Sequence, residues 1–165
     1  MNLARSLKHL IAPHWLTRRT FPAASLAAIE AAVAAAEKRH AGELRFVVEG
    51  GLPLAELWRD LSPRERAQDL FARLRVWDTE HNNGVLIYLQ LIDRQVEIIA
   101  DRGIAARVPP AQWEAVCRGM EQAFRHGAYR DGAVAAVERI GAILAEHFPA
   151  GAEERNELPD QPLLI

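Results

Sequence analysis

The sequence predicts an α/β fold, specifically a three-layer α/β/α sandwich around a small mixed β-sheet. Three apolar segments of strand length lie at residues 44–48, 85–91 and 95–100, and segments with helical spacing of apolar residues separate and follow them. The connection between the first two strands is long enough for a helical crossover, so these strands should be parallel. The tight turn at 93–94 should make the second and third strands antiparallel.

The composition is that of one ordinary globular domain. The chain has 165 residues, of which 50% are hydrophobic and 25% charged, and its net charge is -2. The balanced charge argues against nucleic acid binding, and the single cysteine excludes a disulfide scaffold. No apolar run approaches the roughly 20 residues that span a bilayer. Signatures of common hydrolases, NTPases, dinucleotide-binding proteins and zinc proteases are absent from the sequence.

Residues 1–21 form a basic amphipathic segment. Leu3, Leu7, Leu10, Ile11 and Trp15 follow helical spacing, and no acidic residue precedes position 30. Two interpretations stay open for this segment: it lies on an anionic membrane surface, or its apolar stripe packs on the core of the protein itself. Lys8 and His9 interrupt the apolar core that a secretory signal needs, so we expect a cytoplasmic protein, peripheral at the membrane in the first interpretation.

The first domain helix should follow Phe21-Pro22. We expect Ser25 to cap it and Gly42 to end it, with an apolar stripe between them. The next strand, 44–48, alternates apolar residues on one face with mixed residues on the other. Gly50-Gly51 then breaks the strand.

The clearest local signal is the start of the second domain helix. Ser62 is a capping residue, Pro63 occupies the first helical position, and Glu65 completes a capping box. A polar loop follows at residues 76–84. The nearly continuous apolar run 85–91 then predicts a central strand that is buried on both faces.

Two further helices should complete the domain after the third strand. One begins near Pro109-Pro110, and the other stops at Phe148-Pro149. We therefore divide the chain into the N-terminal segment, one domain over residues 22–148, and an extended tail over residues 149–165. The apolar end of the tail should either pack back on the domain or bind a partner. We expect Trp58, Trp77 and Trp113 to be core or interface anchors.

The predicted topology brings polar residues together at one edge of the sheet. The starts of the first two strands and the end of the third share this edge, which gathers Glu43, the loop 78–83 and Asp101-Arg102. Such oxygen-bearing groups could hold a hard cation, Ca²⁺ or Mg²⁺, and Arg102 could orient a phosphate. The alternative is a solvated edge whose Asp and Asn residues only cap turns. Ligand crevices in open α/β sheets usually lie at the opposite edge, the carboxyl ends of parallel strands.

Several of these motifs, in this order, resemble the TPM-domain family, which includes a thylakoid-lumen acid phosphatase-like protein and bacterial envelope proteins. The resemblance covers roughly residues 25–148. The matching motifs are Gly42-Glu43-Leu44, Asn82-Asn83-Gly84-Val85-Leu86, Asp93-Arg94, Val96-Glu97-Ile98, Gly103-Ile104 and the helix turn at 124–132. Trp77-Asp78-Thr79 and the tail motif 156–160 are similar to a cytoplasmic subgroup that is often encoded beside LemA-type envelope proteins.

The resemblance implies an α/β/α sandwich and, for some members, calcium binding or weak acid phosphatase activity. Two carboxylates that secreted members carry after the third strand are replaced here, at Ile104-Ala105 and Pro110. An altered metal site would use Asp78, Glu80 and Asp101. Catalysis would use Asp101 and Asp78, with ligand contacts from Arg102, Asn82, Asn83 and Glu43.

Three hypotheses for function follow. The favoured one is a non-catalytic binding or regulatory module that joins protein partners at the inner face of the membrane through residues 1–21 and 158–165. The second is a metal-assisted acid phosphatase-like hydrolase. The third is a regulatory domain that binds Ca²⁺ or Mg²⁺ without turnover.

Overall fold

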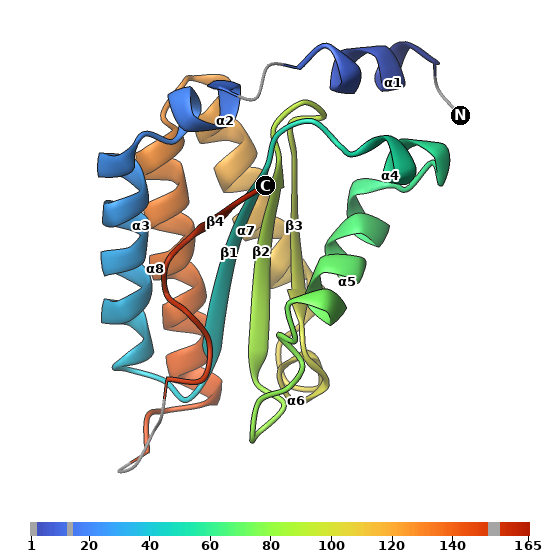
Figure 1. Ribbon diagram of the computed structural model, residues 1–165. Helices are drawn as coiled ribbons and strands as arrows, with labels where there is room; N and C mark the ends of the chain where they lie inside the picture. The colour runs from blue at the N-terminus through green and yellow to red at the C-terminus, as the bar shows by residue number, and fades with distance from the viewer. Residues whose placement is uncertain (1–2, 13–14, 152–155) are drawn as a thin grey trace.

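The computed structural model describes residues 3–12, 15–151 and 156–165. It shows a mixed four-stranded sheet in the order β3-β2-β1-β4 with helices on both faces, which confirms the predicted α/β sandwich (Figure 1). The strands are β1 (Glu43–Glu49), β2 (Gly84–Gln90), β3 (Gln95–Ala100) and β4 (Leu163–Leu164). The helices are α1 (Leu3–Leu10), α2 (Trp15–Thr20), α3 (Ala23–Glu37), α4 (Leu54–Trp58), α5 (Pro63–Arg73), α6 (Arg102–Ala105), α7 (Pro110–Arg125) and α8 (Tyr129–His147).

The strand directions agree with the predicted topology. β1 and β2 are parallel, with Glu43 opposite Gly84, and β2 and β3 are antiparallel, with Val85 opposite Ala100. The short strand β4 adds a parallel neighbour on the other side of β1, which the sequence did not predict. Two residues are too few to carry a periodic signal, so β4 depends on the open edge that β1 offers.

Hydrophobic residues of alternate strand positions face two separate cores. Leu44, Phe46 and Val48 of β1 pack under α3, α7 and α8, which cover one face of the sheet. Val47, together with residues of β2, packs under α5 on the other face (Figure 1). Every residue of β2 is buried, as its unbroken apolar run predicts for a central strand.

The local helix signals gave a correct prediction at α5 and two wrong predictions at α3. Ser62 and Glu65 form the expected reciprocal capping box at the start of α5. Ser25 does not cap α3, because that helix begins two residues earlier at Ala23 and the carbonyl of Pro22 already accepts the N–H of Ser25. Gly42 does not end the helix either; it lies after the turn, next to β1.

The two ends of the sheet have different neighbours, and we name them from the parallel strands. The amino end is where β1 and β2 begin, beside α6, and the carboxyl end is where they finish, beside α1, α2 and α4 (Figure 1). Within the described residues no helix is long and apolar enough to cross a membrane. Residues 1–2 and 13–14 of the N-terminal segment and 152–155 of the tail lie outside the described residues.

Candidate functional site

The amino end brings the three predicted segments together, as the topology required. The backbone N–H of Glu43 donates to the carbonyl of Asn83 at 3.1 Å, and that of Asp101 donates to Gly84 at 2.9 Å. The N–H of Gly103 donates to the carbonyl of Asn82 at 3.1 Å. A side chain at Gly103 would place its Cβ 2.6 Å from that same carbonyl oxygen, so the close contact requires glycine.

Asn83, Asp101 and Glu43 are the most enclosed residues of the predicted set, with 2%, 6% and 6% of their surfaces exposed. The amide of Asn83 donates to the carbonyl of Ala41, and one carboxylate oxygen of Asp101 accepts the N–H of Arg102 at 2.6 Å as the cap of α6. Asn83 Oδ1 and Asp101 Oδ2 are buried without a hydrogen-bond partner in the described part of the chain. Each oxygen could therefore accept a donor or coordinate a cation.

The other predicted ligands are more open. Asp78 is exposed and lies 3.9 Å from Arg75, and Glu80 is exposed, its backbone N–H donating to the carboxylate of Glu157. Asn82 and Arg102 are also exposed. Among the residues the structure describes, no three His, Cys, Asp or Glu side chains are close enough together to hold a metal ion. The predicted metal set of Asp78, Glu80 and Asp101 is thus not assembled by its side chains in this conformation.

The carboxylate of Glu43 instead binds the backbone of the C-terminal tail. It accepts the backbone N–H groups of Glu157 and Leu158, at 3.2 and 3.0 Å. The guanidinium of Arg45 donates to two carbonyls of the tail, those of Pro159 and Gln161. The apolar end of the tail therefore packs back on the domain, and any partner that binds residues 158–165 would meet them in this paired form.

The carboxylates beside the docked tail have raised pKa values. Burial raises the pKa of Glu37 to about 8, although the N–H of Leu44 donates to it, and nearby Glu43 and Asp160 raise it further. Burial also raises the pKa of Glu43. Both side chains accept backbone N–H groups, which lower the pKa, but within the described residues neither forms an ion pair that would offset burial.

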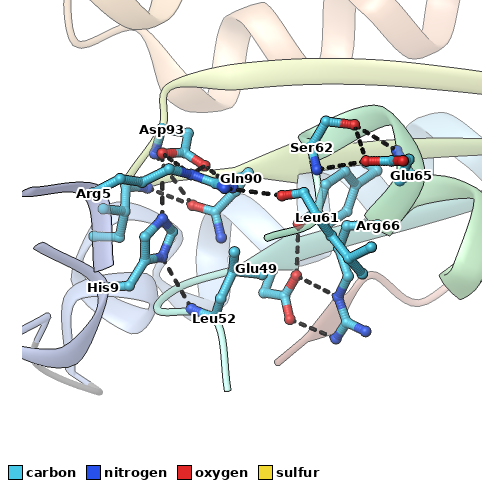
Figure 2. Close-up of polar contacts among 12 residues, drawn as sticks. Arg5, His9, Glu49, Leu52, Leu61, Ser62, Glu65, Arg66, Gln90 and Asp93 are labelled. Carbon is cyan, nitrogen blue, oxygen red and sulfur yellow. Dashed lines mark hydrogen bonds and ion pairs between the residues drawn. The ribbon is translucent and has the colours of Figure 1, made fainter. Parts of the chain in front are cut away.

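At the carboxyl end lies a buried network of charged residues, none of which the sequence predicted to be functional. Arg66 of α5 makes a bidentate ion pair with Glu49 at the end of β1, with contacts of 2.7 and 3.0 Å (Figure 2). Tyr88 donates its hydroxyl to the same carboxylate at 2.6 Å, and burial and the charge of Glu49 raise the pKa of Tyr88. Arg66 also contacts Glu56 and Asp69. The network joins α5 to the sheet.

A second polar contact holds α1 on the same end of the sheet. Arg5 forms an ion pair of 2.8 Å with Asp93 in the β2–β3 turn and donates to the carbonyl of Leu61 (Figure 2). His9 is buried between Asp93 and the backbone of Leu52, whose N–H donates to the ring at 3.0 Å. Helix α1 thus contacts the domain through its polar residues.

The apolar side chains at positions 7, 10 and 11, on and just after α1, are consequently exposed. Leu7, Leu10 and Ile11 are 57%, 54% and 71% exposed. More exposed apolar residues lie nearby, on α2 and α4. Together these six residues form what we call the carboxyl-end surface: Leu7, Leu10, Ile11, Trp15, Leu54 and Trp58. The helical stripe was visible in the sequence, but its outward orientation was not, because the contacts of Arg5 and His9 with Asp93 join residues more than 80 positions apart.

The mixed sheet and the helices that cover both of its faces make this protein an α/β sandwich domain, with polar loops at the amino end. The TPM domain family model matches residues 17–143, and the chain belongs to that family. This confirms the resemblance noted in the sequence; a link to LemA-type proteins stays a prediction.

Two solved structures are similar over most of the chain. The BA42 protein from the psychrophilic bacterium Bizionia argentinensis is 30% identical, with a TM-score of 0.78 over 88% of this chain and 95% of BA42. The N-terminal domain of a protein from P. gingivalis is 21% identical, with a TM-score of 0.62 over 87% of this chain and 97% of that domain, a likeness of fold. No curated protein matches the chain.

Proposed function

We propose that this TPM domain is a non-catalytic binding module that attaches to an anionic lipid surface through the carboxyl-end surface. The observation that carries the proposal is the orientation of α1. Its polar residues Arg5 and His9 are fixed to the domain, while Leu7, Leu10 and Ile11 are exposed to solvent. A helix that served only to cover its own protein would turn this apolar stripe inward.

Neighbouring elements extend the same surface. Trp15 of α2 is 55% exposed, and Leu54 and Trp58 of α4 are 57% and 74% exposed. Tryptophan is favoured at membrane interfaces because its ring combines apolar area with a polar N–H group. Six exposed apolar side chains gathered at one end of a domain indicate an interaction site, whereas scattered ones would not.

The charge around this surface matches an anionic membrane. Lys8, Arg18 and Arg19 are exposed on α1 and α2, and no acidic residue occurs before Glu30. Each basic residue near an anionic leaflet contributes about 1 kcal/mol of binding free energy. Apolar insertion and this attraction would together hold the protein peripherally, at the cytoplasmic face in our proposal. A protein partner of the envelope would meet the tail, residues 158–165, in its docked form.

Vesicle binding tests the proposal directly. We expect the full chain to co-sediment with vesicles that contain phosphatidylglycerol and to bind pure phosphatidylcholine vesicles much more weakly. Trp15→Gln should weaken binding at least fivefold, and Lys8→Gln/Arg19→Gln should weaken it more than tenfold, from about 1 kcal/mol per charge.

The chain offers a matched control for this experiment. Trp77 is 50% exposed, nearly the same as Trp15, but lies at the amino end of the sheet, and Trp77→Gln should leave vesicle binding unchanged. Equal binding to both kinds of vesicle, or equal loss in Trp15→Gln and Trp77→Gln, would contradict the proposal.

A second candidate function is the binding of a divalent cation at the amino end. It is favoured by one observation, the two buried oxygens Asn83 Oδ1 and Asp101 Oδ2, which have no partner among the described residues. Carboxylate and amide oxygens are the ligands that Ca²⁺ and Mg²⁺ prefer. With Arg102 close in sequence, such a cation would also be the starting point for acid phosphatase-like chemistry through Asp101 and Asp78.

Thermal unfolding in the presence of Ca²⁺ or Mg²⁺ tests this candidate. A ligand at a hundred times its dissociation constant adds about 2.7 kcal/mol, a shift of a few degrees for a domain of this size. Asp101→Asn should abolish the shift, whereas Asp78→Asn should not. No shift with either ion would reject the candidate and leave the proposal of lipid binding untouched.

A further inference from the structure

A pocket of about 650 Å³ opens at the carboxyl end of β1, between α1, α2 and α4. Its volume falls within the range of small-molecule sites. β1 has parallel neighbours on both sides, β2 and β4, and the pocket lies just beyond its last residue. In open α/β sheets ligands bind outside the carboxyl ends of parallel strands, so the position is the one that the topology favours.

Two glycines shape the wall of the pocket. A Cβ at Gly50 would lie 2.6 Å from Thr17 Oγ1, and a Cβ at Gly51 would lie 2.6 Å from the carbonyl oxygen of His9. The absence of side chains here lets both N-terminal helices approach the end of β1 directly. The pocket thus exists only while α1 and α2 are docked, and α1 is held by the contacts of Arg5 and His9 with Asp93.

The lining combines apolar and polar groups with one charged side chain. Leu10, Leu52, Leu54 and Leu164 supply apolar walls. Among the side chains of the described lining residues, that of Arg18 carries a formal charge, while the ring of His9 is already engaged on both nitrogens. The main chain of Ile165 also lines the pocket, and its carbonyl accepts the N–H of Gly50. An apolar chamber with a cation beside it is complementary to an amphiphile that has an apolar chain and an anionic head.

The pocket is also continuous with the proposed lipid-binding surface. Leu10 and Leu54 line the pocket and are each more than half exposed, so the same side chains belong to both features. We infer that the pocket takes one acyl chain of an anionic lipid, with the lipid phosphate beside Arg18. This inference rests on the proposed function and deepens it. It names a specific lipid-binding site, whereas the surface alone would give only non-specific binding to a membrane.

Binding of a monomeric lipid tests the pocket apart from the membrane. The probe is a lysophosphatidylglycerol with a twelve-carbon chain, kept below its micelle concentration and titrated into the full ¹⁵N-labelled chain. We expect one-to-one saturation with amide shifts at Gly50, Gly51 and Leu164. Glycerol phosphate, the head alone, should bind at least tenfold more weakly, and so should the zwitterionic lysophosphatidylcholine of the same chain length.

Variants locate the binding. Ala12→Phe places a ring in the pocket and should weaken lysolipid binding at least tenfold, whereas Ala111→Phe, at an exposed alanine of α7, should not. Arg18→Gln changes an exposed side chain without altering the packing, so it tests the site even if Ala12→Phe unfolds the protein. It should weaken binding about fivefold.

The outcomes separate this inference from the proposed function. Vesicle binding without saturable lysolipid binding would overturn the inferred lipid site in the pocket but not the proposed membrane-binding surface. Lysolipid shifts confined to other parts of the domain would do the same. Equal affinity for glycerol phosphate would also overturn it, because the acyl chain would then contribute nothing. Saturable binding at Gly50 and Gly51 without vesicle binding would support the pocket and contradict the proposed membrane surface.

Discussion

Buried acidic side chains have different partners at the two ends of the sheet. At the carboxyl end, acidic groups pair with arginine: Glu49 with Arg66, and Asp93 with Arg5. At the amino end, Glu37 and Glu43 accept backbone N–H groups of Leu44 and of the tail. An opposite charge and hydrogen bonds to the charged form both favour an ionised carboxylate, whereas burial disfavours it.

The pKa shifts of Asp93 at the carboxyl end and of Glu37 and Glu43 at the amino end have opposite directions. Burial by itself would raise the pKa of Asp93, but the hydrogen bond and charge of Arg5 outweigh it, so the pKa of Asp93 is lowered. Burial raises the pKa of Glu37 to about 8, and that of Glu43 also rises. The contribution of Asp93 to stability is therefore lost in acid, as pH falls through its lowered pKa, whereas that of Glu37 is lost as pH rises through about 8.

The largest effect should come from breaking the network at the carboxyl end. Arg66→Met leaves Glu49 buried without its cation, and removal of one partner from a buried pair costs about 3–5 kcal/mol. Urea denaturation should show this loss. Arg75→Met, at an exposed arginine, should change stability by less than about 0.5 kcal/mol. A loss below about 1 kcal/mol in Arg66→Met would mean that the network is not important for stability.

A smaller effect is expected at Glu37, and it depends on pH. Its raised pKa means that the native state holds a proton that the unfolded chain releases above its ordinary pKa. The stabilisation is complete below that ordinary value and is lost as pH rises through about 8. Allowing for partial exposure, we expect wild type to lose about 2 kcal/mol between pH 5 and pH 9 from this group.

Glu37→Gln should remove most of that pH dependence, because the amide oxygen still accepts the N–H of Leu44 and does not ionise. Denaturation at pH 5, 7 and 9 measures it, with Glu138→Gln on the exposed face of α8 as the control. A pH profile unchanged in Glu37→Gln would show that this carboxyl titrates normally.

The contact that holds α1 should contribute less than either of these. Asp93→Asn removes the charge that pairs with Arg5 and contacts His9, in a site that is only partly buried, and should cost about 1 kcal/mol. Hydrogen exchange at the amide of Leu52, which donates to His9, should accelerate. Asp131→Asn, at an exposed pair, is the comparison and should leave that amide unchanged. Unaltered exchange in Asp93→Asn would show that α1 is held by other contacts.

The smallest effect should be at Asp78. Its side chain is 55% exposed and its contact with Arg75 is long, so Asp78→Asn should change stability by less than about 0.5 kcal/mol. Asp101→Ala, which removes the buried cap of α6, should cost about 1 kcal/mol by thermal or urea unfolding. Equal losses in both variants would contradict the different burial of the two side chains.

Local patterns in the sequence determined the three long strands, their directions and the α5 capping box. These follow from side-chain periodicity and from contacts within one helical turn, such as that between Ser62 and Glu65. They also placed Glu43, Asn83 and Asp101 at one edge, because strand direction alone decides which ends meet. The error at Ser25 came from the same local level: the extended backbone of Pro22 starts the helix earlier.

Only the tertiary structure decided what faces water and which charges are paired. Arg66 and Glu49 are 17 residues apart and Arg5 and Asp93 are 88 apart, so no short window of sequence can show that they meet. Strand β4 exists because β1 has an open edge, and the stripe of α1 faces outward because Arg5 and His9 are bound on its other side. Periodicity reveals that a helix has an apolar face, but the packing of distant elements determines where that face points.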